Sequence, residues 1–331
     1  MRHMKKTDSA LGVLFASTIL SACGGGGESA PQMAPITLHV TDAPIDPTEI
    51  AAVCIPFTRI TVHYAGQSAV TLDYNPLPSQ VRPETHCMTG SVWTGQSPVP
   101  PVRLSALGGP LTVALAESLQ IPVGRVTWIR LHFATGAYVL ESSGAQQNLV
   151  CPSCEPTENN AGRGFKLNRT FEVESAGLAL TVDIDLLKSL HRESSDYVLR
   201  PTVRVENTAA LGTIAGTVHE NLVGSTYDGT TVETGCAVYV FQGTDAAVDD
   251  HHVSSTVLSS ARVRYSEALG NYGYAAGALP GGSPAEPVQY TVALTCHSDD
   301  PNTDATTEVA FTPGQNASVV AGQTTAIDFT P

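Results

Sequence analysis

The sequence predicts an all-β protein with two antiparallel β-sandwich-like domains, residues 36–207 and 212–331. Apolar and polar residues alternate with period two along most of the chain, a pattern typical of strands with one face on a core. Proline and glycine clusters separate the alternating segments, and helical periodicity is scarce. The length of 331 residues allows about two domains.

The expected elements follow from this alternation. A short helix is expected over residues 111–119 and one helical turn over 187–192, and residues 73–101 are expected to form an irregular loop. The expected strands of the first domain are residues 36–41, 128–133, 178–186 and 197–205. Those of the second domain start at Ile214 and include residues 236–241, 290–296, 309–311 and 326–329.

The N-terminus has the three parts of an export signal. Arg2, Lys5 and Lys6 form a positive segment, residues 10–20 are apolar, and residues 20–23 read Leu-Ser-Ala-Cys, a lipobox. The apolar run is too short to span a bilayer. We therefore expect residues 1–22 to be a lipoprotein signal peptide, with cleavage before Cys23 and acyl chains such as palmitate on that cysteine. The alternative is an ordinary signal peptide followed by a chance cysteine.

Residues 23–35 are expected to form a flexible tether. Four glycines follow Cys23 directly, and such a stretch has no side chains to pack. The segment resembles the tether of Gram-negative lipoproteins, and glycine rather than aspartate after the cysteine implies sorting to the outer membrane, facing the periplasm or the cell surface. Two or three acyl chains on one cysteine anchor a protein stably.

The charge of the chain argues against nucleic-acid partners. The net charge is −14, and loss of residues 1–22 makes it −16 because three basic residues and one acidic residue are removed. Such a chain is repelled by nucleic-acid phosphates and by anionic lipid head groups. Cations or neutral sugars are better-matched ligands.

Six cysteines remain once Cys23 is assigned to lipid, and an oxidising compartment favours disulfides. Cys236 shares the strand parity of Val238 and Val240, and Cys296 shares that of Val292 and Leu294. Both thiols are therefore expected on core-facing sides and are expected to pair. By elimination, Cys54 would pair with Cys87 and Cys151 with Cys154, although six cysteines allow fifteen pairings.

Cys151 and Cys154 have the spacing of a redox C-x-x-C motif. A redox motif needs a following helix that lowers the thiol pKa, and no helical pattern follows in this loop rich in Pro, Asn and Gly. A zinc site would need Cys54 and Cys87 as a second ligand pair. We therefore expect a structural disulfide between Cys151 and Cys154.

Two acidic segments are candidate cation sites. Residues 249–252 read Asp-Asp-His-His, but adjacent residues on a strand point to opposite faces, so a solvated acidic loop is the alternative. Asp300, Asn302 and Asp304 alternate as the ligands of a calcium loop do, without the glycine and distal glutamate of an EF-hand. No cofactor is expected apart from this calcium candidate.

Asp183 and Asp185 alternate with Val182 and Ile184, and so are expected on the polar face of a strand. If the next strand pairs with this one, Arg200 and Arg204 can form exposed ion pairs with them, worth ~0.2–1 kcal/mol each. The alternative is two catalytic carboxylates flanking a substrate, but nothing separates their pKa values. We interpret the pair as structural.

Five segments of the first domain resemble a family of bacterial lipoproteins, domain of unknown function 4382. They are residues 38–44 (LHVTDAP), 121–125 (IPVGR) with 129–131 (IRL), 165–168 (FKLN), 182–186 (VDIDL) and 199–201 (LRP). The resemblance spans residues 36–206 and implies a domain architecture and an envelope location. It implies no catalytic residue.

The second domain resembles a carboxypeptidase-regulatory or transthyretin-like β-sandwich. The similar segments are residues 212–218 (GTIAGTV), 237–240 (AVYV), 290–292 (YTV) and 321–325 (AGQTT). The resemblance implies immunoglobulin- or prealbumin-like sandwiches acting as spacers or adhesive modules, at the level of fold alone.

These observations leave two functional hypotheses. The first is a non-enzymatic envelope lipoprotein, held to the membrane by lipid on Cys23, that binds a polysaccharide or an envelope protein. The absence of a nucleophile elbow, an H-E-x-x-H motif and a P-loop favours this first hypothesis. The second is a calcium- or carbohydrate-dependent enzyme accessory, or a hydrolase with an unfamiliar site. A deep pocket with carboxylates and histidine would favour the second, and a flat or aromatic-lined surface the first.

Overall fold

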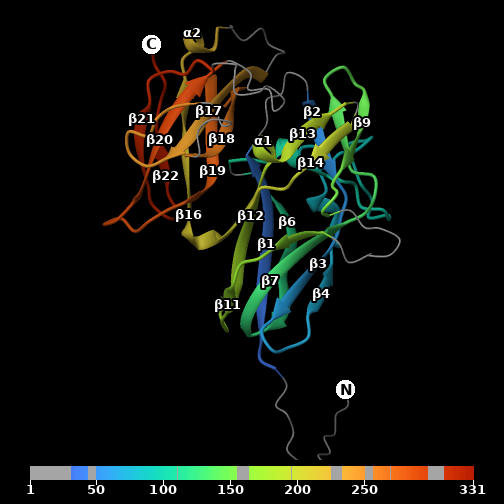
Figure 1. The fold of residues 1–331 in the computed structure, drawn as a ribbon. Helices are drawn as coiled ribbons and strands as arrows, with labels where there is room; N and C mark the ends of the chain where they lie inside the picture. The colour runs from blue at the N-terminus through green and yellow to red at the C-terminus, as the bar shows by residue number, and fades with distance from the viewer. Residues whose placement is uncertain are drawn as a thin grey trace, which may run out of the picture. The chain divides into compact units, whose positions relative to one another are not determined.

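The chain folds as an all-β protein, as the alternation predicts (Figure 1). The structure is a computed structural model that describes residues 31–43, 50–109, 111–154, 164–194, 196–224, 233–249, 256–268, 270–296 and 309–331. Gln32–Pro331 forms one compact unit. Strands of residues 33–207 and strands of residues 211–326 belong to separate sheets.

Two sheets pack face to face in the first half. The β1 sheet has the order β15-β12-β1-β6, with β1 (Met33–Ala43), β6 (Val113–Pro122), β12 (Leu178–Asp185) and β15 (Val203–Asn207). The β7 sheet has the order β10-β7-β3-β4, with β3 (Phe57–Tyr64), β4 (Val70–Asp73), β7 (Gly124–Phe133) and β10 (Phe165–Leu167), and β11 (Phe171–Val173) also pairs with β7. Figure 1 shows β3, β4 and β7 in front of β1, β6 and β12.

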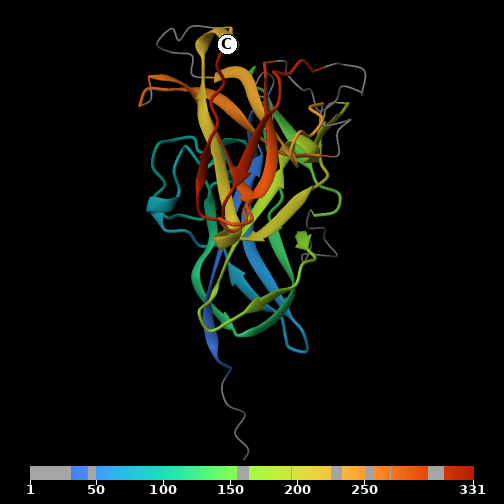
Figure 2. The ribbon, with the colours of Figure 1, turned by 90° about the vertical axis from the view of Figure 1, so that its left-hand side faces the viewer.

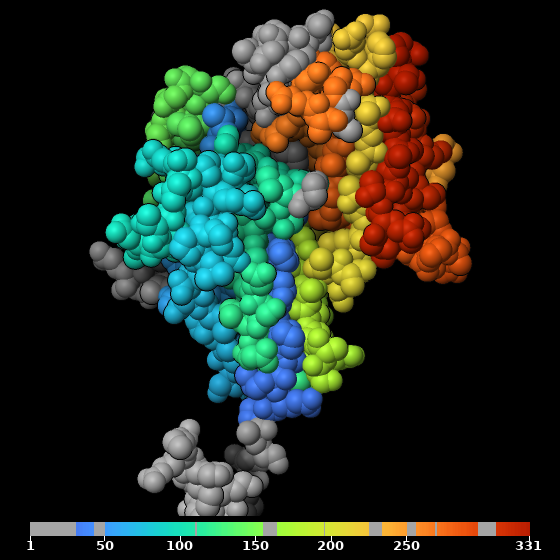
Figure 3. Space-filling model, turned by 180° about the vertical axis from the view of Figure 1, so that it is seen from behind, coloured from blue at the N-terminus to red at the C-terminus, as the bar shows by residue number. Residues whose placement is uncertain are grey.

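Alternate residues of both sheets meet in one apolar core. Full burial of such a side chain contributes about 1.5–3 kcal/mol. The outer face of the β1 sheet is seen in Figure 3, with β1 in blue between β6 and β12. Core side chains that are at most 2% exposed include Leu38, Val40, Ile60, Val62, Ile129, Leu131, Val182 and Ile184.

A third sheet extends this half, in the order β13-β14-β9-β8-β2-β5. Its strands are β2 (Ile50–Ile55), β5 (Val102–Arg103), β8 (Tyr138–Glu141), β9 (Gln146–Val150), β13 (Leu190–Glu193) and β14 (Asp196–Leu199). As predicted, residues 74–101 form a long loop without a named strand. The loop contains one 3-10 helix, Pro78–Gln80. The Cys54–Cys87 disulfide and a 3.1 Å hydrogen bond between Tyr74 Oη and His86 Nε2 hold this long loop.

The second half is a single seven-stranded sheet, the β17 sheet, seen in yellow to red in Figure 2. Its edge strands approach each other, since Thr325 Oγ1 donates to the Ser318 carbonyl at 2.6 Å. A disulfide joins Cys236 to Cys296. The order is β21-β20-β17-β18-β19-β16-β22, with β16 (Leu211–Val218), β17 (Glu233–Gln242), β18 (Val257–Ser266), β19 (Asn271–Pro280), β20 (Val288–Thr295), β21 (Gln315–Val319) and β22 (Thr324–Ala326).

Both faces of β17 are buried, as expected for a strand whose residues are almost all apolar from Cys236 to Phe241. Val238 and Val240 lie in the core of the second half, while Tyr239 and Phe241 belong to the core cluster of the first half. A close backbone approach accompanies this packing: a Cβ on Gly109 would lie 2.8 Å from the Ala275 carbonyl oxygen. Only glycine fits there without a shift of the backbone.

Two expected elements are absent from the described residues. Residues 113–122 form β6, not a helix; Leu111, Leu115 and Leu119 lie four residues apart, a spacing that keeps strand parity and therefore fits a strand as well as a helix. Residues 309–311 form no strand, and Phe311 instead packs on Tyr239 with ring centroids 5.2 Å apart.

Two further expectations need correction. The segment 197–205 is two strands in different sheets, β14 and β15, because Pro201 has no N–H to continue the ladder. The sheets are not purely antiparallel: β1 with β12, β9 with β14 and β16 with β22 are parallel pairs. The expected turn at residues 187–192 is present as α1 (Leu186–Ser189). Besides Pro78–Gln80, the described residues also form α2 (Glu220–Val223) and the 3-10 helices Leu104–Ala106 and Thr208–Ala210.

Candidate functional site

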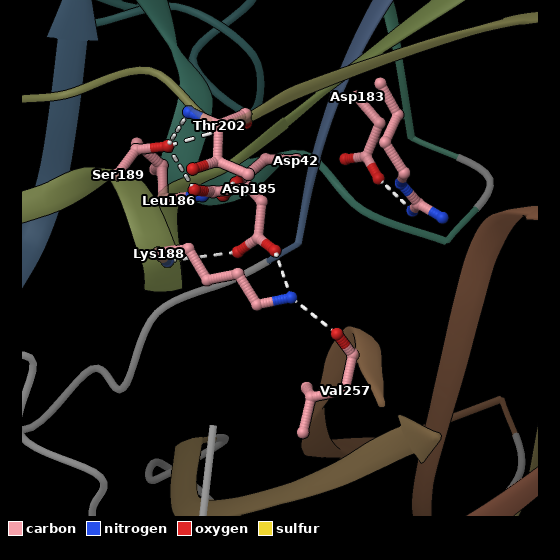
Figure 4. A network of polar contacts seen from close by, with 9 residues as sticks. Asp42, Asp183, Asp185, Leu186, Lys188, Ser189, Thr202 and Val257 are labelled. Carbon is pink, nitrogen blue, oxygen red and sulfur yellow. Dashed lines mark hydrogen bonds and ion pairs between the residues drawn. The ribbon is translucent and has the colours of Figure 1, made fainter. Parts of the chain in front are cut away.

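The aspartates singled out from the sequence lie in a buried cluster (Figure 4). Asp183 and Asp185 are 4% and 5% exposed, and Asp42 of β1 is 4% exposed. The expectation of an exposed polar face is wrong, because β18 of the second half packs on the β1 sheet and β12 is buried on both sides from Leu180 onward. The parallel register sets Asp42 opposite Ile184, between the other two aspartates.

Each carboxylate of the cluster holds a neighbouring part of the chain. Asp42 Oδ1 accepts a hydrogen bond from the Leu186 N–H at 3.0 Å. Asp185 Oδ1 caps α1 by accepting from the Lys188 N–H at 3.1 Å. Asp183 pairs with Arg204, which faces it across the antiparallel β12–β15 register. The predicted cross-strand pair is thus present, but it is buried.

The rest of the predicted charge pairing differs. Asp185 forms its ion pair with Lys188, at 3.2 Å, and Lys188 Nζ also donates to the Val257 carbonyl of β18 (Figure 4). Arg200 pairs with Glu193 on β13. β12 and β15 do not form a hairpin, because α1, β13 and β14 lie between them in sequence.

Burial dominates the electrostatics of the cluster. It raises the pKa of Asp42 well above the ordinary value, the Leu186 N–H opposes this rise, and the charges of Asp183 and Asp185 add to it. Burial also raises the pKa of Asp183, although Arg204 pulls it down. These contacts are all internal, so the geometry favours a structural role for the three carboxylates.

A groove of about 550 Å³ lies between β10 and β15, the edge strands of the β7 and β1 sheets. Arg169 bridges its two sides, since it donates to the Val205 carbonyl and pairs with Glu206. A concave site with an apolar lining and a few polar groups is typical of ligand binding. The apolar lining comes from Phe165, Leu167, Val203 and Val205, and the polar lining includes Lys166, Asn168, Arg169, Arg204 and Glu206.

A row of side chains on the outer face of the β7 sheet leads to this groove. We call His63, Trp128, Arg130 and Lys166 the Trp128 row. The His63 ring stacks on Trp128 with centroids 4.7 Å apart and planes 12° apart. Arg130 Cζ lies 5.2 Å and Lys166 Nζ 5.0 Å from the Trp128 ring centroid, within the range of cation–π attraction. Lys166 belongs to both the row and the groove.

Hydroxyl and imidazole groups continue this face. Thr61 Oγ1 lies 3.2 Å from Thr71 Oγ1 and 2.9 Å from His132 Nε2, and His63 Nδ1 lies 2.8 Å from Thr127 Oγ1. These groups can both donate and accept hydrogen bonds. The β7 sheet therefore presents an aromatic ring, cations and hydroxyls on one face.

A smaller cavity, of about 280 Å³, lies against the outer face of the β1 sheet. It contains His39 and Glu117, the residue types of acid–base chemistry. His39 Nδ1 lies 3.1 Å from Thr112 Oγ1, and Glu117 accepts from Gln80 at 2.5 Å. Burial lowers the pKa of His39, against the opposing charge of Glu117.

The cysteine candidates are all used in disulfides. Cys54 is bonded to Cys87, Cys151 to Cys154 and Cys236 to Cys296. These bonds leave no free thiolate among the described cysteines for the redox or zinc readings. No three His, Cys, Asp or Glu side chains of the described residues converge as a metal site.

The remaining candidates lie outside the described residues. They are Cys23, the calcium candidates Asp300, Asn302 and Asp304, and residues 250–252 of the Asp-Asp-His-His segment. Their assignments stay predictions. Among the residues that are described, no helix has the length and hydrophobicity needed to cross a membrane.

Sequence reasoning missed the Trp128 row, the groove and Asp42. The signal for the row was the polar half of an alternating strand, in which Trp128, Arg130 and His132 share one face. The groove had no local signal, because its two sides, β10 and β15, are far apart in sequence.

Comparison with known proteins gives a family and distant structural likenesses. A "putative adhesin" from Bacteroides ovatus matches with 9% identity over 95% of this chain and 99% of that chain, at a TM-score of 0.20. A "putative cell adhesion protein" from Bacteroides fragilis matches with 12% identity over 89% and 92%, at a TM-score of 0.19. Scores this low support no inference, and no curated protein matches. The family model for a domain of unknown function (DUF4382) matches residues 33–201, half of the chain, and the protein belongs to that family.

Proposed function

We propose that this chain is a non-enzymatic binding protein of the cell envelope, with its ligand site at the groove and the Trp128 row. The single observation that carries the proposal is the position of Lys166, which lines the 550 Å³ groove and lies 5.0 Å from the Trp128 ring. Lys166 thereby belongs both to the groove and to the aromatic, hydroxyl-bearing sheet face. The ligand is a polysaccharide or an envelope protein.

The envelope location rests on the N-terminal pattern. The lipobox at residues 20–23 and the glycine tether after it support a lipid anchor on Cys23 in the outer membrane, facing the periplasm or the surface. In this proposal residues 36–207 carry the binding site. Residues 212–331 serve as a carboxypeptidase-regulatory-like spacer.

A second candidate function, a hydrolase or enzyme accessory, is favoured only by the His39–Glu117 cavity. Both side chains bond to neutral neighbours, Thr112 and Gln80. An acid–base pair would need to reach a substrate proton within hydrogen-bond distance. Release of reducing ends from glycans by the wild-type chain, abolished by Glu117→Gln, would establish this candidate in place of simple binding.

A glycan array, together with a pull-down from envelope extract, tests the proposed function. The soluble form lacking residues 1–27 should bind, and Trp128→Ala should weaken binding because the row loses the ring that orders its cations. Trp93→Ala is the matched control, since Trp93 is the other tryptophan, lies in the loop of residues 74–101 and bonds the Gln96 carbonyl through its Nε1. Equal loss with both variants, or no binding in either assay, would contradict the proposal.

A further inference from the structure

Like charges face each other across the β7–β10 strand pair. Lys166 lies directly opposite Arg130 in the antiparallel register, and both cations lie within 5.2 Å of the Trp128 ring. Like charges in directly opposed positions destabilise a sheet. The cation–π contacts offset part of that repulsion, and an anion bound between the two cations would remove more of it.

Positive charge continues from the row into the groove. Arg169 and Arg204 line the groove with Lys166, and they pair with Glu206 and Asp183 respectively. Lys166 has no ion-pair partner among the described residues. Lys166 is therefore the cation best placed to meet an anionic ligand.

The net negative charge of the chain does not oppose a local anion site. Charges more than about 8–10 Å apart are largely screened at physiological salt. The acidic remainder of the chain instead disfavours binding of a polyanion elsewhere. An acidic ligand is therefore expected to bind at the row and the groove and not elsewhere on the surface.

The chemistry beside the cations suits a sugar chain. Thr61, Thr71 and His63 present hydroxyl and imidazole groups on the same face, and the Asn168 amide lines the groove. Such groups can both donate to and accept from sugar hydroxyls. Building on the proposed function, we propose that the ligand is an acidic polysaccharide, whose carboxylates bind between Lys166 and Arg130 and whose hydroxyls meet the threonine face and the groove.

Three probes separate the parts of this proposal. An oligogalacturonate carries the carboxylates on a sugar chain, its methyl ester keeps the sugars without the charge, and polyglutamate keeps the charge without the sugars. The form lacking residues 1–27 should bind the oligogalacturonate, and more weakly as salt rises. Esterification should weaken binding at least about tenfold, the worth of one charge-assisted contact.

Matched variants locate the site. Lys166→Gln should weaken oligogalacturonate binding about tenfold without lowering the unfolding midpoint, because the repulsion with Arg130 is relieved. Arg192→Gln is the control: Arg192 lies on β13, 5.7 Å from the Tyr197 ring, and so is also a cation over an aromatic ring. It should bind like wild type.

The outcomes are distinguishable. Equal binding of the methyl ester would overturn the acidic ligand and leave the proposed binding function standing. Equal binding of polyglutamate would overturn the polysaccharide. Equal loss with Arg192→Gln would show that net charge, not this site, governs binding. No binding of any probe overturns this inference, and the glycan array and the pull-down then decide the proposed function.

Discussion

Breaking the buried Asp183–Arg204 pair tests the structure of the aspartate cluster. Asp183→Asn removes the negative charge and leaves the guanidinium, which cannot lose its proton. The two side chains are 5% and 21% exposed. Removing one partner of a buried pair costs about 3–5 kcal/mol, and we expect about 3 kcal/mol because Arg204 keeps some contact with water. An exposed pair would cost at most about 1 kcal/mol.

Arg204→Met approaches the same pair from the other side. Asp183 can take up a proton, and burial already raises its pKa. For an acid with a raised folded pKa, stability is full below the unfolded value and is lost as pH rises through the folded one. Without Arg204 that folded pKa is higher still. Arg204→Met should therefore destabilise little at about pH 4 and strongly at about pH 7.

Urea unfolding of the form lacking residues 1–27, at both pH values, measures these differences. The double variant should recover much of the loss, because neither charge is left buried alone. A loss below about 1 kcal/mol for Asp183→Asn at both pH values would show that the pair is solvated as an exposed pair is. The assignment of Asp183 and Arg204 to a buried ion pair would then be wrong.

Three further predictions follow from the same contacts. Asp42→Asn should gain stability relative to wild type as pH rises from about 4 to 7, because burial raises the pKa of Asp42 and wild-type stability is lost as pH rises through that folded pKa. The asparagine side chain still accepts from the Leu186 N–H. Free energies of unfolding that change equally with pH in the two proteins would contradict this. Replacing Cys236 and Cys296 by alanine should lower the free energy of unfolding by about 4 kcal/mol, from loop entropy over their separation of 60 residues, and an unfolding midpoint equal to that of the oxidised wild type would refute it. Cys23→Ala should release the protein from membranes or leave an uncut precursor, and fractionation like wild type would refute the anchor.

The strands could be predicted where one face meets a core and the other meets water. This holds for β1, where Leu38 and Val40 point inward and Thr37 and His39 point the other way. The parity argument also led to the Cys236–Cys296 pair that the structure contains, but its expectation of two core-facing thiols is wrong for Cys296, which is exposed just after β20 ends. In β6, Leu111, Leu115 and Leu119 keep strand parity but also have the spacing of a helix face, so the pattern alone could not decide between the two.

The sites could not be predicted because they depend on pairing between distant segments. The pattern of its own strand predicts that Asp183 is exposed, and its burial depends on β18 of the second half packing on the β1 sheet. The groove requires β10 and β15 to be edges of neighbouring sheets. Only the composition of the Trp128 face is local, with Trp128, Arg130 and His132 on one side of a strand.

The most direct test of the binding site uses the two tryptophans of the chain as paired reporters. Their indole N–H groups give two separate signals in a ¹⁵N-labelled sample of the form lacking residues 1–27. Titration with oligogalacturonate should shift the Trp128 signal, because Lys166 and His63 flank its ring. The Trp93 signal, from an indole bonded to the Gln96 carbonyl, should stay in place. A shift confined to Trp93, or a saturable titration that moves neither signal, would contradict a ligand site at the Trp128 row.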